Sequence, residues 1–127
     1  MNKRLIGGEM EKRIRDYMEN NGYRVVEMNY RCKQGEIDII ADDGNYLCFV
    51  EVKYRHDTTH GYPEEAVDIR KQHRICNAAR YYMYSHGMNE YTPVRLDVAS
   101  ILNDDIRYIE NAFDWVVWKL SFLWKYT

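Results

Sequence analysis

A tight turn between two apolar runs constrains this chain more than any other feature. Residues 42–45 read Asp-Asp-Gly-Asn, a composition typical of the turn of a β-hairpin. The turn joins residues 35–41 and 46–54, which are rich in Ile, Val, Phe and Tyr and are therefore expected to be strands. The chain is thus predicted to contain an antiparallel hairpin near its centre, around which its other elements pack.

Side chains alternate between the two faces of a strand, so the hairpin separates two sets of residues. A two-residue turn can be centred on residues 43–44 or 44–45, and the second register pairs Asp38 directly with Glu51. Both registers place Asp38, Glu51 and Lys53 on one face, and only a three-residue loop would separate them. The opposite, apolar face is expected to be core and carries Ile37, Ile39, Val50 and Val52.

Two carboxylates and an ammonium on one face have two interpretations. One is a solvated sheet face on which Glu51 and Lys53 form a surface ion pair. The other is a metal site, because Asp38 and Glu51 repel each other unless a cation lies between them. Ligands with oxygen atoms alone favour Mg²⁺ or Mn²⁺ over zinc. Such a metal polarises a phosphoryl oxygen and activates a bound water, which Lys53 can orient.

The other segments predict an α/β domain. Helices and strands are expected at residues 8–20, 23–31, 63–85 and 94–102, with a short further strand after the turn at 103–105. The order is one helix, a three-strand meander, a second helix and then one or two strands. This order predicts a mixed sheet in a sandwich-like domain rather than a doubly wound parallel sheet. The segment Arg95-Leu96-Asp97 is expected to support the core or to pair internally rather than to perform chemistry.

Composition limits the classes of partner. The 127 residues are expected to form one domain, and their net charge of −2 argues against a non-specific nucleic-acid coat protein. That charge is compatible with an enzyme whose acidic metal site lies beside a local basic patch. No apolar run approaches the roughly 20 residues that span a bilayer, and no secretory signal is expected. The three cysteines predict reduced thiols in a cytoplasmic protein.

Several short sequence motifs resemble those of a known family. Asp38 followed by Glu51-x-Lys53 across a hairpin resembles the PD-(D/E)XK motif of restriction-endonuclease-like nucleases, with Ile37 in place of the proline of the motif's name. The chain as a whole resembles the YraN-like family of small bacterial proteins. The matching motifs span about residues 7–113. They comprise Gly8-Glu9, Asn29-Tyr30-Arg31, residues 35–40, 49–55 and 61–67, Lys71, and residues 95–98.

This resemblance implies a restriction-endonuclease-like core, with relatives among Holliday-junction resolvases and other DNA nucleases. It implies an endonuclease-like hydrolase that depends on Mg²⁺ or Mn²⁺ and cleaves DNA, with branched or damaged DNA as candidate substrates. Asp38 and Glu51 would hold the metal, and Lys53 would complete the catalytic set. Glu9 on the first helix is a further acidic candidate. Its alternative interpretation is a favourable charge in the first turn of that helix.

Basic residues beside the hairpin are candidates for binding nucleic acid. Arg31 and Arg55 flank the hairpin, whereas Lys71 and Arg74 lie on the second predicted helix with Lys71 nearest the site. The alternative is an ordinary solvated face. These candidates leave open a second function, in which the chain is a nucleic-acid-binding module of the same fold that cleaves little.

The end of the chain carries large apolar residues at helical spacing, over about residues 112–125. This helical tail has two interpretations. It packs back on its own domain, or it forms the interface of a homodimer, where large aromatic residues are enriched. A third function follows from the second interpretation, namely an interaction protein that uses its tail to join a larger assembly.

Overall fold

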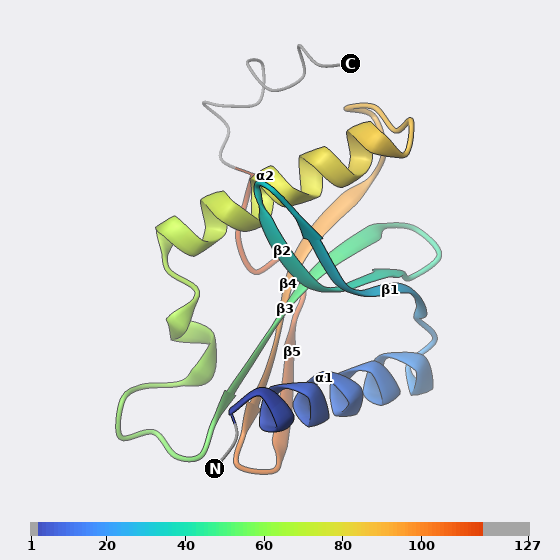
Figure 1. The fold of residues 1–127 in the computed structure, drawn as a ribbon. Coiled ribbons are helices and arrows are strands. Elements are labelled where there is room, and N and C mark those ends of the chain that lie inside the picture. The colour runs from blue at the N-terminus through green and yellow to red at the C-terminus, as the bar shows by residue number, and fades with distance from the viewer. Residues whose placement is uncertain (1–2, 116–127) are drawn as a thin grey trace.

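A five-stranded mixed sheet forms the centre of the protein in a computed structural model, which describes residues 3–115 (Figure 1). In sheet order the strands are β1 (Arg24–Cys32), β2 (Gly35–Asp42), β3 (Leu47–Arg55), β4 (Val94–Leu102) and β5 (Asp105–Ile109). β3 and β4 are parallel, whereas the other neighbouring strands are antiparallel. The helical elements are α1 (Lys3–Asn20), η1 (Pro63–Ala66) and α2 (Ile69–Ser85). The predicted α/β fold with a mixed sheet is confirmed.

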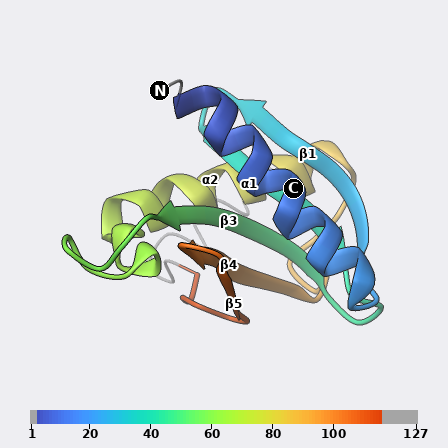
Figure 2. The same ribbon diagram turned by 90° about the horizontal axis from the view of Figure 1, so that it is seen from below.

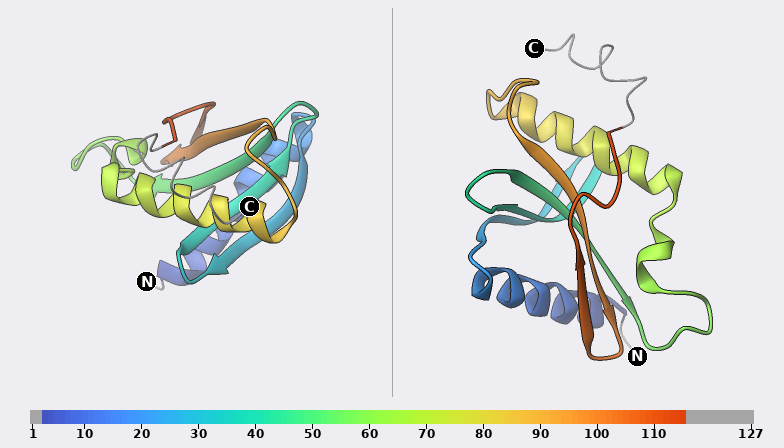
Figure 3. Two further views of the ribbon diagram at one scale, coloured as in Figure 1. Left: turned by 90° about the horizontal axis from the view of Figure 1, so that it is seen from above. Right: turned by 180° about the vertical axis from the view of Figure 1, so that it is seen from behind.

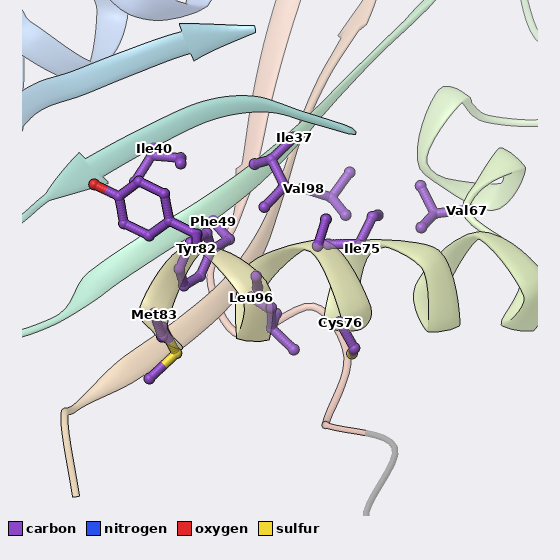
Figure 4. Close-up of a cluster of buried hydrophobic side chains, with 12 residues drawn as sticks. Ile37, Ile40, Phe49, Val67, Ile75, Cys76, Tyr82, Met83, Leu96 and Val98 are labelled. Carbon is purple, nitrogen blue, oxygen red and sulfur yellow. The ribbon is translucent and has the colours of Figure 1, made fainter. Parts of the chain in front are cut away.

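The two long helices cover opposite faces of the sheet, as Figures 2 and 3 show. On one face, Ile14 and Met18 of α1 pack against Ile39, Val50 and their neighbours. On the other face, α2 covers the larger cluster drawn in Figure 4, which includes Phe49. Because both faces are covered, residues 48–51 of β3 are buried in succession rather than alternately.

The hairpin register is the one that pairs Asp38 with Glu51. The ladder between β2 and β3 runs from Asp42–Leu47 to Ile39–Val50, and the next step along it brings Asp38 opposite Glu51. Beyond that step the two strands diverge (Figure 1). This register corresponds to a turn centred on residues 44–45, closed by a hydrogen bond from the Asp43 N–H to the Tyr46 carbonyl at 3.2 Å.

The predicted face of Ile37 was wrong. Ile37 lies in the core under α2, whereas Ile39 lies in the core under α1. The rule of alternation assumes a continuous ladder, and the ladder between β2 and β3 ends at Ile39. At the facing position of β1, Asn29 has a φ of 55°, which also bends the backbone there.

The predicted second helix was also wrong, because it is two elements. η1 ends at Ala66, and Val67 leaves helical geometry with φ −90° and ψ 77°. Asp68 then caps α2, since its side chain accepts a hydrogen bond from the Lys71 N–H at 2.9 Å. Apart from the start of α1, the predicted end of the first helix and the predicted bounds of the first four strands differ from the observed ones by at most one residue.

The first residues of the predicted tail pack on their own domain. Ala112, Phe113 and Trp115 are partly buried against the core under α2, and the Arg80 guanidinium lies 4.8 Å from the centre of the Trp115 ring. Residues 116–125 of the predicted helical tail lie outside the described residues. None of the described helices combines the length and hydropathy that crossing a bilayer requires.

A buried ion network holds the hairpin turn against β4. Asp97 is fully buried and accepts hydrogen bonds from the Arg95 guanidinium, the Tyr108 hydroxyl at 2.7 Å and the Asn111 N–H at 2.9 Å. Arg95 also pairs with Asp43 of the turn at 2.8 Å. The predicted internal pairing of Arg95-Leu96-Asp97 is confirmed, and it ties the turn to β4.

We expect Asp97→Asn to lower the free energy of unfolding by about 3 kcal/mol, because it leaves the Arg95 charge buried with weaker partners. Urea unfolding followed by fluorescence measures this loss. Asp105→Asn is the matched control, since Asp105 is exposed at the start of β5. A loss below about 1 kcal/mol, typical of an exposed ion pair, would contradict a structural role of the network.

Candidate active site

Asp38 lies where β2 separates from β3. Its side chain accepts a hydrogen bond that a backbone carbonyl of β2 would otherwise accept. Its Oδ2 accepts a hydrogen bond from the Val52 N–H at 2.8 Å. That N–H would otherwise lack a partner on β2, because the ladder ends at Ile39–Val50. The hydrogen bond therefore fixes the Asp38 carboxylate beside the neighbouring Glu51.

Glu51 is a buried acid, with 4% of its surface exposed. The Lys71 Nζ lies 3.2 Å from its Oε2, which is within the distance of an ion pair. The same Oε2 has no hydrogen-bond partner among the described residues, so the contact with Lys71 lacks hydrogen-bond geometry. Glu51 thus keeps a buried oxygen that a better-placed cation could satisfy.

The pKa of Asp38 is raised from its ordinary value of 3.8 to about 8. Burial is the largest cause, followed by the hydrogen bond and the negative charge of Glu51. The Val52 N–H and the Lys71 charge act in the opposite direction. The acidic pair therefore retains a proton at neutral pH, which a bound cation would displace.

Lys53 follows Glu51 by two residues on β3 and shares its face. The regular parallel register with β4, where Lys53 lies beside Ser100, keeps the alternation intact here. Val50 and Val52 accordingly pack on the α1 side of the sheet. The register thus brings Asp38 and Glu51 together, and Lys53 lies two residues further along β3 on the face of Glu51.

The donor set fits a hard divalent cation. Asp38 and Glu51 supply carboxylate oxygens, and one of these oxygens is buried without a hydrogen bond. No group of three or more His, Cys, Asp or Glu side chains arranged for a metal occurs in residues 3–115. Two carboxylates with the remaining positions filled by water or substrate are typical of Mg²⁺, which retains several of its waters.

A further acid on α1 was missed from the sequence. Glu11 is half-buried, and its pKa is raised by burial and then by the negative charge of Asp38. The signal was available, because Glu11 shares a helix face with the core residues Ile14 and Met18. Glu9 is exposed two residues earlier, and its role in the site stays a prediction.

The predicted nucleic-acid contacts fall in different places. Arg31 is exposed on β1 and pairs with Glu36 at 3.3 Å. Arg74 is exposed on α2 beneath the tip of the β1–β2 hairpin, where a Cβ on Gly35 would lie 3.2 Å from the Arg74 carbonyl oxygen. Arg55, at the end of β3, lines a surface pocket together with Tyr54, His56, Asp57 and His60. Lys71 differs from these arginines because it reaches Glu51.

Comparisons with known proteins agree with the earlier resemblance. The model of a family described as "Uncharacterised protein family UPF0102" matches residues 10–101, a segment that contains Glu11, Asp38, Glu51 and Lys71. A UPF0102 protein of Lachnoclostridium phytofermentans is 48% identical over 114 residues, which cover 90% of this chain and 97% of that protein. A UPF0102 protein of Persephonella marina is 42% identical over 110 residues, covering 87% and 94%.

The raised pKa of Asp38 predicts how stability depends on pH. A carboxyl that keeps its proton up to about pH 8 when folded, but loses it near pH 4 when unfolded, makes folding take up a proton between these values. The free energy of unfolding therefore falls as the pH rises through this range. We expect Asp38→Asn to be more stable than the natural chain at pH 8, by a margin that shrinks toward pH 5.

Urea unfolding in EDTA at several pH values measures this margin, which changes by at most about 1.4 kcal/mol per pH unit. Asp104→Asn is the control, because Asp104 is exposed in the turn before β5. A margin for Asp38→Asn that is the same at pH 5 and pH 8 would show that this carboxyl titrates normally.

Proposed function

This chain belongs to the uncharacterised protein family UPF0102, and we propose that it is a metal-dependent nuclease that hydrolyses phosphodiester bonds in DNA. One observation carries the proposal. A buried glutamate, Glu51, has an oxygen without a hydrogen bond, and it lies beside a second carboxylate with a lysine two residues further on. Burying two carboxylates side by side costs free energy unless a bound cation neutralises their charge.

Each residue of the site then has a distinct task. Asp38 and Glu51 hold Mg²⁺ or Mn²⁺, which when bound polarises a phosphoryl oxygen and activates water. The Val52 N–H fixes the orientation of the Asp38 carboxylate. Lys53 orients the attacking water or stabilises the charge that develops on the phosphate. Glu11 adds negative charge on the α1 side of Asp38.

Contacts with DNA come from local positive charge rather than from the total charge of −2. Arg31 and Arg74 are exposed near the tip of the β1–β2 hairpin, and Arg55 lies two residues beyond Lys53. Guanidinium groups in these places neutralise backbone phosphates on either side of the scissile bond. Branched or damaged DNA remains the proposed substrate, and the cytoplasm the proposed compartment.

One contact favours a second candidate function. The ion pair between Lys71 and Glu51 at 3.2 Å partly neutralises the acidic pair without any metal. A chain that kept this ion pair permanently would be a nucleic-acid-binding module of the nuclease fold that cleaves little.

Cleavage of labelled single-stranded, duplex, flap and four-way-junction DNA, and of structured RNA, in Mg²⁺, Mn²⁺ or EDTA tests the proposal. We expect metal-dependent cutting that falls by at least about 100-fold in Glu51→Gln and in Lys53→Met. Glu19→Gln, at an exposed position of α1, is the control. Cutting that persists in EDTA or in both variants would refute the proposed site. DNA binding without any cutting would favour the binding module.

The two acids of α1 can be compared directly. We expect Glu11→Gln to lower cleavage by about tenfold, because Glu11 acts on the charge of Asp38 from beside the site. Glu9→Gln is the matched substitution on the exposed position of the same helix. A larger loss in Glu9→Gln than in Glu11→Gln would assign the α1 acid of the site to Glu9 instead.

A further inference from the structure

A lysine from α2 reaches the buried acid of the proposed metal site. The Lys71 Nζ lies 3.2 Å from the Glu51 Oε2, although Lys71 and Glu51 come from different elements that pack across one face of the sheet. We propose that Lys71 is the internal counter-ion of the metal-free site, and that a divalent metal displaces it from Glu51. This inference rests on the proposed function, because it concerns the same acidic pair.

The contact is suited to being released. The Glu51 side chain is only 5% exposed, whereas the Lys71 side chain is 27% exposed and so reaches the site from its open side. The ammonium is close to Oε2 but makes no hydrogen bond of good geometry with it. Lys71 therefore supplies charge without saturating the carboxylate, and its long flexible stem can swing toward solvent.

The position of Lys71 on α2 indicates that Glu51, rather than the helix, holds the ammonium in place. Lys71 lies in the first turn of α2, where the backbone N–H groups point outward and the helix dipole disfavours a cation. That turn contains no acidic residue to compensate. The Asp68 cap fixes the backbone of Lys71 through its N–H at 2.9 Å. Among the contacts described, only the acidic pair therefore holds the Lys71 ammonium in place.

A metal and Lys71 cannot share the acidic pair without strong repulsion. Lys71 lies against the Glu51 Oε2 and offsets part of the negative charge of the two carboxylates. A divalent cation on the same Oε2 would meet the ammonium as a like charge in a buried, weakly screened place. The metal therefore drives Lys71 outward, where its ammonium can bind a phosphate of the substrate. Metal binding and DNA binding are then positively coupled through one side chain.

Calorimetric titration of the metal alone, without DNA, tests this displacement. We expect Lys71→Gln to bind Mn²⁺ about fivefold more tightly than the natural chain, because an internal competitor is removed. The same variant should unfold at a lower temperature in EDTA and gain more stability from Mn²⁺. Arg70→Gln, at the adjacent exposed position in the first turn of the same helix, is the matched control and should bind Mn²⁺ as the natural chain does.

A second measurement needs no substitution. Acetylation of lysines by an amine-reactive ester, read by mass spectrometry, should modify Lys71 faster in Mg²⁺ than in EDTA. Lys12 and Lys33 are exposed and should react equally in both. Slower or unchanged labelling of Lys71, together with unchanged Mn²⁺ affinity in Lys71→Gln, would overturn the displacement while leaving the metal site intact. Absence of Mn²⁺ binding in both proteins would overturn the metal site itself and the displacement with it.

Discussion

The separation of β2 from β3 at Asp38 is the constraint on which the rest of the site depends. A strand that leaves its neighbour abandons a backbone N–H, and the Asp38 carboxylate takes the place of the missing carbonyl by accepting from Val52. Because a side chain replaces a backbone carbonyl as the acceptor, a carboxylate lies within the sheet itself. The adjacent Glu51 then lies beside it in a buried position, where two carboxylates are stable only with a proton or a cation.

Neighbouring elements act on the charge of this acidic pair in opposite directions. α2 covers the same face of the sheet and supplies Lys71, whereas α1 brings Glu11 toward Asp38. The site therefore has a cation on one side and a third acid on the other. Lys71 offsets part of the charge of the pair, whereas Glu11 adds to it.

The alternation of side chains between the two faces of a strand explains why much of the candidate site could be predicted from the sequence. A hairpin with a two-residue turn must place Asp38, Glu51 and Lys53 together, whichever of its two registers forms. Ile37 does not follow this rule, because β2 has separated from β3 before Ile37 and is there paired with β1 alone. Glu11 lies on the apolar face of its helix, but its role was overlooked because the sequence does not show that this face lies near Asp38. Likewise, the approach of Lys71 to Glu51 depends on how α2 crosses the sheet, which local sequence does not encode.

The parallel pairing of β3 with β4 has a consequence for how the protein is made. β3 carries Glu51 and Lys53, yet its neighbour along this stretch is β4, whose paired residues come 47 positions later in the chain. The buried Asp97 of β4 also anchors the hairpin turn through Arg95 and Asp43. A chain still emerging from the ribosome therefore holds its acids on an uncovered strand edge until β4 arrives. The hairpin that carries Asp38 and Glu51 is synthesised early but completed late, so an unfinished copy has no assembled acidic pair.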